Sequence, residues 1–172
     1  MCSDFTLPLF ELFASLLEYP TPALASRVAA CIEQLSCTQP EAAKKLAEFK
    51  SYLKEFSQAQ MEELYTRTFD MQPICYPYVG YHLFGESYKR GVFMAKLVEG
   101  YLAYGYAVDQ ELPDHAAVVL HFLALDVTAR SSDFGRSLLL DGLLPTLEKM
   151  AKALEDQAVN PYRAVLSALL LF

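Results

Sequence analysis

Positive charge is scarce in this 172-residue sequence. Its 14 Lys and Arg residues stand against 21 Asp and Glu residues, which leaves a formal net charge of -7. Binding of a phosphate backbone needs clustered basic side chains, so nucleic acid is not an expected partner. No Lys or Arg precedes Arg27, and the sequence therefore lacks the positively charged segment that opens a secretory signal.

Long apolar runs are absent as well. The two most apolar stretches, residues 118–125 and 164–172, are far shorter than the roughly 20 residues that a membrane-spanning helix requires. We therefore expect no insertion into a membrane and a cytoplasmic location.

The motifs of common catalytic sites are also missing. The sequence contains no glycine-rich phosphate loop, no Gly-x-Ser-x-Gly turn and no His-Glu-x-x-His zinc motif. Its four cysteines form no Cys-x-x-Cys pair, and we expect mostly buried thiols that behave as small hydrophobic groups. Neither an enzyme nor a bound cofactor or metal is predicted.

Two weaker interpretations leave a chemical site open. His82, His115 and His121 are candidate ligands in a small helical protein that binds a metal or haem, although a spacing of six places His115 and His121 on different faces of one helix. Cys75 and His115 are a conceivable nucleophile and base, because such a pair need not be adjacent in sequence. Nothing in the sequence supplies a third orienting group.

The pattern of apolar residues is helical throughout. No stretch alternates in the manner of a β-strand, and Leu and Ala are far commoner than Val, Ile and Thr. We predict one all-α domain over residues 1–172, a single compact bundle of about seven to nine helices. The expected helices cover residues 4–19, 22–36, 40–56, 57–69, 88–106, 114–129, 134–154 and 161–172. We expect Thr38 to cap the helix that begins at Pro40. Pro145 lies inside the helix predicted over residues 134–154, so that helix either begins near Asp141 or is kinked at Pro145.

Residues 65–126 are the predicted functional centre. Seven of the eleven tyrosines lie between Tyr76 and Tyr106, several of them in an aromatic loop over residues 75–85. Residues 97–129 contain five acids and no Lys or Arg. An aromatic groove edged with carboxylates suits an apolar peptide that carries arginine, since arginine stacks on rings and pairs with carboxylates.

Asp114 has two interpretations in this stretch. It directly precedes a predicted helix, where aspartate is a favoured N-cap and its charge suits the helix dipole. It is also the natural acid to receive the basic side chain of a bound peptide.

Five motifs resemble those of one family. The chaperones that assemble molybdenum-cofactor oxidoreductases, the TorD-like group, are similar to this chain from residue 16 to about residue 125, and the nitrate reductase delta (NarJ-type) branch most of all. The motifs are Leu17-x-Tyr19-Pro20, Tyr65-x-x-Thr68-Phe69-Asp70, Tyr88-x-Arg90-Gly91, Tyr101-x-x-x-Gly105-Tyr106 and Glu111-Leu-Pro-Asp-His115-x-x-Val118-Val119-Leu120.

The resemblance implies an all-helical chaperone that is not an enzyme. Its partner would be the catalytic subunit of a molybdo-enzyme, nitrate reductase or a related one, held through an N-terminal leader-like peptide, twin-arginine leaders included. The chaperone keeps this subunit ready for cofactor insertion before membrane attachment or export, and cofactor-insertion proteins are further candidate partners. The predicted peptide-binding residues are Tyr76, Tyr78, Tyr81, Phe84, Tyr88, Pro113, Asp114, His115, Val118 and Phe122, with Tyr65 and Phe69 bracing them.

Two departures from the family pattern leave the client enzyme open. His121 stands where the nitrate reductase branch usually carries Glu, and the loop that begins Cys75-Tyr-Pro-Tyr is closer to the wider TorD-like version. A different class of function, a permanent accessory subunit of the same enzyme, would use the same surface.

Overall fold

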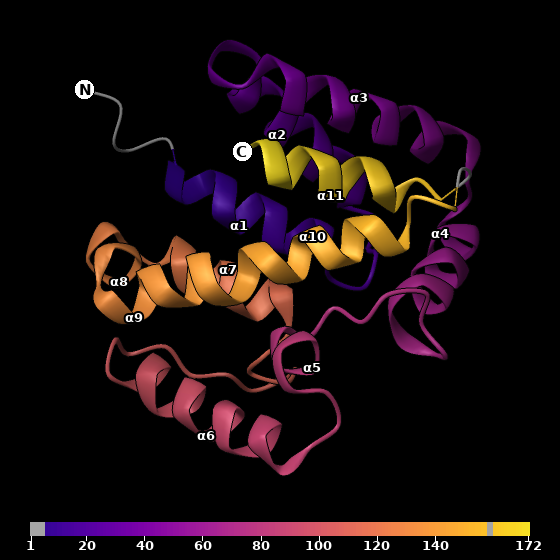
Figure 1. Cartoon of the computed structure of the whole chain (residues 1–172). Coiled ribbons are helices and arrows are strands. Elements are labelled where there is room, and N and C mark those ends of the chain that lie inside the picture. Colours follow the sequence, from indigo (N-terminus) through magenta and orange to yellow (C-terminus); the bar gives the residue numbers. More distant parts are fainter. Residues whose placement is uncertain (1–5, 158–159) are drawn as a thin grey trace. The chain divides into compact units, whose positions relative to one another are not determined.

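Helices are the only extended regular elements in the computed structural model, which describes residues 6–157 and 160–172 (Figure 1). The predicted all-α class is confirmed. The helices are α1 (Thr6–Leu16), α2 (Leu24–Thr38), α3 (Pro40–Glu55), α4 (Gln58–Tyr65), α5 (Val79–Phe84), α6 (Tyr88–Leu102), α7 (Ala116–Ala124), α8 (Val127–Ser131), α9 (Asp133–Ser137), α10 (Leu144–Ala153) and α11 (Tyr162–Leu171), with two π-helical segments, η1 (Thr66–Asp70) and η2 (Leu138–Leu143).

Local capping chemistry explains most helix boundaries. Ser57 and Gln60 form a capping box at the start of α4, in which each side chain accepts a hydrogen bond from the other residue's backbone N–H. Asp126 caps α8 by accepting from Ala129, and this cap divides the helix predicted over residues 114–129 into two. The prediction that Thr38 caps α3 is wrong, because Thr38 still belongs to α2 and its hydroxyl bonds back to the carbonyl of Gln34.

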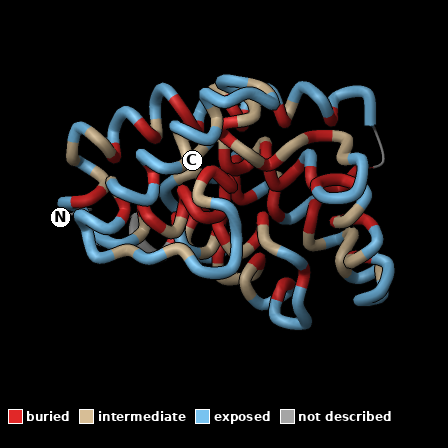
Figure 2. Tube along the Cα trace, turned by 90° about the horizontal axis from the view of Figure 1, so that it is seen from below, coloured by how far each residue is buried: buried red, intermediate tan, exposed pale blue. Residues whose placement is uncertain are grey.

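The contacts of the chain divide it into two units, each assembled from segments far apart in sequence. The first unit contains residues 1–14 and 77–146, and the second contains residues 15–76 and 147–172. Within each unit buried and exposed residues alternate along the helices with helical spacing, as Figure 2 shows. The single domain over residues 1–172 stays a prediction.

In the second unit α3 packs against both α2 and α11 (Figure 1). Each helix contributes an apolar stripe, and the ring of Phe49 lies 5.4 Å from that of Tyr162. Tyr162 also contacts Phe69, at 4.9 Å between ring centroids, and Tyr65, at 6.1 Å. The Tyr65-x-x-Thr68-Phe69 motif therefore supplies core rings of this unit.

In the first unit α7 is the central helix. Seven of its nine residues are buried, as expected of a helix that is apolar on all sides. Tyr101 of α6 is also fully buried, and its ring lies 4.9 Å from Phe122 of α7. Tyr101 thus belongs to this core, whereas Tyr104 contacts Phe122 and is 37% exposed.

Pro145 follows the π-helical segment η2, at the second position of α10. The wider turn of η2 ends where the N–H of Leu144 donates to the carbonyl of Leu139. Pro145 is the next residue. Because proline has no N–H to donate, it would disturb a regular α-helix at this position. The helix therefore continues through Pro145 with a π-bulge before it. Among the described residues, no helix combines the length and the apolar character needed to cross a membrane.

Candidate functional site

A short antiparallel bridge joins the aromatic segment to the Pro-Asp-His motif in the first unit. Tyr78 and His115 face each other in this bridge. The N–H of Val79 donates to the carbonyl of Asp114, and the N–H of Ala116 donates to the carbonyl of Pro77, each at 2.7 Å. The aromatic segment and the Pro-Asp-His motif are therefore one structural feature.

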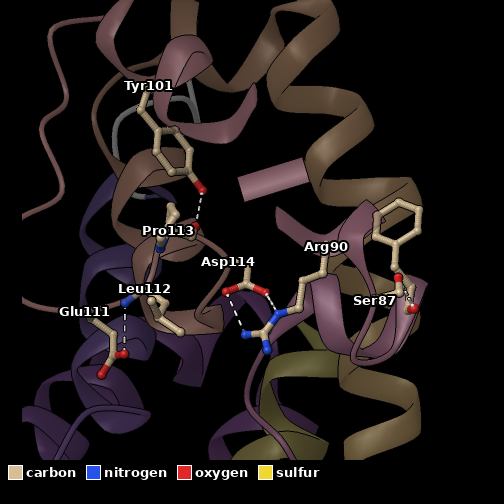
Figure 3. A network of polar contacts seen from close by, with 8 residues as sticks. Ser87, Arg90, Tyr101, Glu111, Leu112, Pro113 and Asp114 are labelled. Carbon is tan, nitrogen blue, oxygen red and sulfur yellow. Dashed lines mark hydrogen bonds and ion pairs between the residues drawn. The ribbon is translucent and has the colours of Figure 1, made fainter. Parts of the chain in front are cut away.

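An ion pair joins Arg90 to Asp114, whose carbonyl takes part in this bridge (Figure 3). Nε of Arg90 lies 2.8 Å from Oδ2 of Asp114, and a second guanidinium nitrogen lies 3.2 Å from Oδ1. The Asp114 side chain has no exposed surface, and that of Arg90 is 18% exposed. The hydrogen bond to Asp114 raises the pKa of Arg90 above its ordinary value, against the opposing effect of burial, so the guanidinium keeps its positive charge.

Gly80 permits the close approach of this ion pair. A Cβ at position 80 would lie 2.6 Å from Oδ2 of Asp114 and 3.0 Å from Cγ of Arg90. Real Cβ atoms do not come that close to an oxygen, so any side chain here would push the pair apart. The glycine of the aromatic segment is therefore required by packing, in a helix where its φ is ordinary.

The Tyr78 ring covers the guanidinium of Arg90, and His115 packs against that ring. The guanidinium carbon of Arg90 lies 5.0 Å from the centroid of the Tyr78 ring, within the range of a cation–π contact. The rings of Tyr78 and His115 meet edge to face at 5.3 Å. Arg90 is thus enclosed by a carboxylate and an aromatic face of its own chain.

His115, and not Asp114, is the N-cap of α7. Nδ1 of His115 accepts a hydrogen bond from the N–H of Ala117 at 3.1 Å, so this nitrogen carries no proton. The predicted N-cap role of Asp114 is wrong because both of its oxygens are directed at Arg90. Tyr101 fixes the start of the motif by donating its hydroxyl proton to the carbonyl of Pro113 at 2.9 Å.

The ten predicted peptide-binding residues fall into three classes of exposure. Phe84 and Tyr88 are exposed, at 39% and 87%. The side chains that lie partly at the surface are Tyr76, Tyr78, Tyr81 and Pro113, of which Tyr76 belongs to the second unit. The buried ones are Asp114, His115, Val118 and Phe122. In this structure a bound peptide would therefore contact the atoms that cover these four side chains, and not the side chains themselves.

The aromatic segment is also more regular than the predicted loop. Residues 79–84 form the short helix α5, which begins directly after the bridge. The proline and glycine content of residues 75–85 indicates a loop, but the hydrogen bonds to Pro77 and from Val79 fix the backbone. Phe84 is thereby carried to the side of α6, with its ring 5.4 Å from Phe93.

In the sequence, Arg90 is identified only as one position of the Tyr88-x-Arg90-Gly91 motif, and no role is predicted for it. A partial signal was available, because residues 97–129 contain five acids and no Lys or Arg, so a buried acid there needs a cation from another segment. Phe93 and Lys96 of α6 were also missed as surface residues. They line, together with Leu83, Leu97 and Leu138, a groove of about 340 Å³ between α5, α6 and η2.

The two alternative chemical sites receive no structural support. No group of three or more His, Cys, Asp or Glu residues is placed to hold a metal ion in residues 6–157 and 160–172. Cys75 is buried, and burial raises the pKa of its thiol to about 12, so the nucleophilic thiolate is disfavoured at neutral pH. Cys31 is buried in the same way and Cys37 is exposed, while Cys2 lies outside the described residues.

Comparisons with known proteins identify a matching family and a solved structure of similar fold. The profile of the nitrate reductase delta subunit family matches residues 36–166. A crystal structure of a candidate redox enzyme maturation protein from Archaeoglobus fulgidus matches with a TM-score of 0.62 and 23% identity, over 96% of this chain and 90% of that one. At this identity the likeness shows a shared fold. No curated protein gives a significant sequence match.

Proposed function

The chain belongs to the nitrate reductase delta subunit family, and from that premise we propose that it is a chaperone for the maturation of a redox enzyme. Its client is the catalytic subunit of a molybdenum-cofactor oxidoreductase, nitrate reductase or a related enzyme. The chaperone binds the N-terminal leader-like peptide of this subunit in the cytoplasm and keeps the subunit open to cofactor insertion, before membrane attachment or export.

One observation carries this proposal: exposed aromatic rings stand beside a rigid, ion-paired bridge. Phe84 and Tyr88 are large apolar side chains that are exposed. Exposed apolar side chains that lie together on a protein surface mark a site of interaction. Arg90 and Asp114 hold the adjoining backbone in one geometry, so little conformational entropy is lost when a peptide binds there.

In this proposal the buried residues position the site. Asp114 and His115 fix the bridge and the start of α7, and Tyr78, Tyr81, Phe84 and Tyr88 offer the rings that meet the peptide. The chaperone has no reaction to catalyse. It protects its client through higher affinity for the immature state than for the mature one.

Calorimetric titration with the N-terminal peptide of a molybdo-enzyme subunit encoded beside this gene tests the proposal. We expect saturable binding that weakens on the order of tenfold in Tyr88→Ala, because truncating an anchoring ring costs more than about 1 kcal/mol. Leu125→Ala, which removes an exposed apolar side chain at the end of α7, is the matched control. Absence of binding by the unaltered protein would reject the proposal.

A permanent accessory subunit is the second candidate, because the matching family is described as a subunit. Both functions predict binding of the catalytic subunit. A chaperone leaves that subunit once it is mature, whereas an accessory subunit stays bound to it. Purification of the mature enzyme from its native source separates them: a chaperone is missing from the cofactor-loaded complex, and a subunit is present in equal amount.

A further inference from the structure

One face of α6 forms a second part of the surface next to the bridge. Lys89, Val92, Phe93 and Lys96 follow the spacing i, i+3, i+4 and i+7, which places them on the same side of the helix. Together with Phe84 and Tyr88 they line a shallow groove of about 280 Å³. We call this surface the α6 groove.

The α6 groove is apolar in the middle and positive at both ends. None of its lining residues is acidic. Within the described residues neither Lys89 nor Lys96 has an ion-pair partner, in contrast to Lys44 and Lys45 of α3, which pair with Glu41 and Glu48. The helical rise separates the Cα atoms of Lys89 and Lys96 by roughly 10 Å along the axis.

Four acids of the first unit are engaged in contacts of their own, while Glu86, Glu99 and Asp109 are exposed and do not line the α6 groove. Asp114 is buried against Arg90. Glu111 folds back and accepts the N–H of Leu112 at 2.9 Å (Figure 3), and Asp126 caps α8. Asp141 lines the neighbouring groove, where the Ser137 hydroxyl donates to it. The exposed rings therefore adjoin cations that lack partners.

We propose that the α6 groove binds an apolar segment of the client that carries two carboxylates about 10 Å apart, one for Lys89 and one for Lys96. Such a spacing corresponds to residues i and i+3 of an extended segment or to i and i+7 of a helix. Val92, Phe93, Phe84 and Tyr88 receive the apolar side chains between the acids. This inference rests on the proposed chaperone function and assigns the charge of the segment that the chaperone selects.

An array of overlapping peptides from the whole catalytic subunit, probed with the purified full chain, tests the inference. The strongest spots should be apolar peptides with paired acids, and an acid-to-lysine exchange in those peptides should abolish them. The charge-reversed variant Lys89→Glu/Lys96→Glu should lose on the order of tenfold in affinity for the acidic peptides and gain affinity for their lysine versions. The control Lys54→Glu/Lys152→Glu makes the same change in net charge on exposed residues of the second unit and should leave the array pattern unchanged.

The outcomes separate the two proposals. If no peptide of the subunit binds, the chaperone function itself is rejected. If peptides bind but Lys89→Glu/Lys96→Glu leaves the pattern and affinity intact, or if arginine-rich peptides dominate, the inference alone is overturned. If sedimentation shows a dimer that the double reversal dissociates, a second copy of the chain occupies the groove, and the inference is likewise overturned.

Discussion

Gly80 lies directly against the carboxylate of Asp114, so that a Cβ at position 80 would be only 2.6 Å from Oδ2. This relationship links the aromatic segment to the Pro-Asp-His motif by packing, in addition to the two backbone hydrogen bonds of the bridge. Arg90 lies on the same side, with its Cγ 3.0 Å from the same point. A methyl group at position 80 would therefore collide with both partners of the ion pair.

The variant Gly80→Ala should be destabilised by about 1–3 kcal/mol, the usual cost of forcing a methyl group into packed surroundings. Gly91→Ala is the matched control, because position 91 lies in α6 with nothing within 4 Å of an added Cβ. That control should gain up to about 1 kcal/mol from the better helix propensity of alanine. Urea denaturation measures both, and equal stability of the two variants would contradict the packing argument.

The Arg90–Asp114 pair should respond unequally to removal of its two partners. Arg90→Met leaves a carboxylate that has no exposed surface, at a cost of about 3–5 kcal/mol. Asp114→Asn leaves a guanidinium that is 18% exposed and can reach water, so the loss should be about 1–2 kcal/mol.

The double variant Arg90→Met/Asp114→Asn should lose less than the sum of the single losses. A coupling of about 1–3 kcal/mol is expected for side chains in direct contact. Additive losses in denaturant titrations would show that the two charges do not depend on each other.

Local signals predicted much of the helical framework. The helices predicted over residues 22–36, 40–56 and 88–106 agree with α2, α3 and α6 to within four residues at each end, since each depends on apolar residues spaced within one segment. These features could be read from the sequence because the chain that makes them is contiguous.

The site itself depends on contacts that no local pattern encodes. Arg90 and Asp114 are 24 residues apart, and the sequence shows only that an acid precedes a helix. Helix α5 forms where proline and glycine indicate a loop, because the backbone of Pro77 and Val79 is held by residues 114 and 116. The sequence could not show that Asp114 is buried, nor that its partner is Arg90 and not the neighbouring Lys89.

The buried hydrogen bond between Asn160 and Thr68 gives a prediction for the second unit. Nδ2 of Asn160 donates to Oγ1 of Thr68 at 2.8 Å, and the Thr68 hydroxyl donates to Leu64. Thr146 is equally buried and donates to the carbonyl four residues before it, Gly142. Thr68→Val should therefore cost about 1 kcal/mol more than Thr146→Val, because it also leaves the Asn160 amide without its acceptor. Equal losses in thermal or urea unfolding would show that the long-range bond contributes nothing.

Two buried thiols make the stability of the fold sensitive to alkaline pH. Burial raises the pKa of Cys31 and Cys75 from 9.0 to about 12. Above pH 9 the unfolded chain loses these protons while the folded chain keeps them, so the free energy of unfolding falls with rising pH until about pH 12. Each thiol contributes a slope of about 1.4 kcal/mol per pH unit within this window.

The comparison of unaltered protein with Cys31→Ala/Cys75→Ala isolates this effect from the titration of lysine and tyrosine. The double variant should be less stable at pH 7, because it leaves cavities, yet its stability should fall less steeply between pH 9 and pH 11. Exposed Cys37 provides the internal check: Cys37→Ala should leave the slope unchanged, because this variant keeps both buried thiols. Identical slopes for the unaltered protein and the Cys31→Ala/Cys75→Ala variant would mean that the two thiols ionise without unfolding.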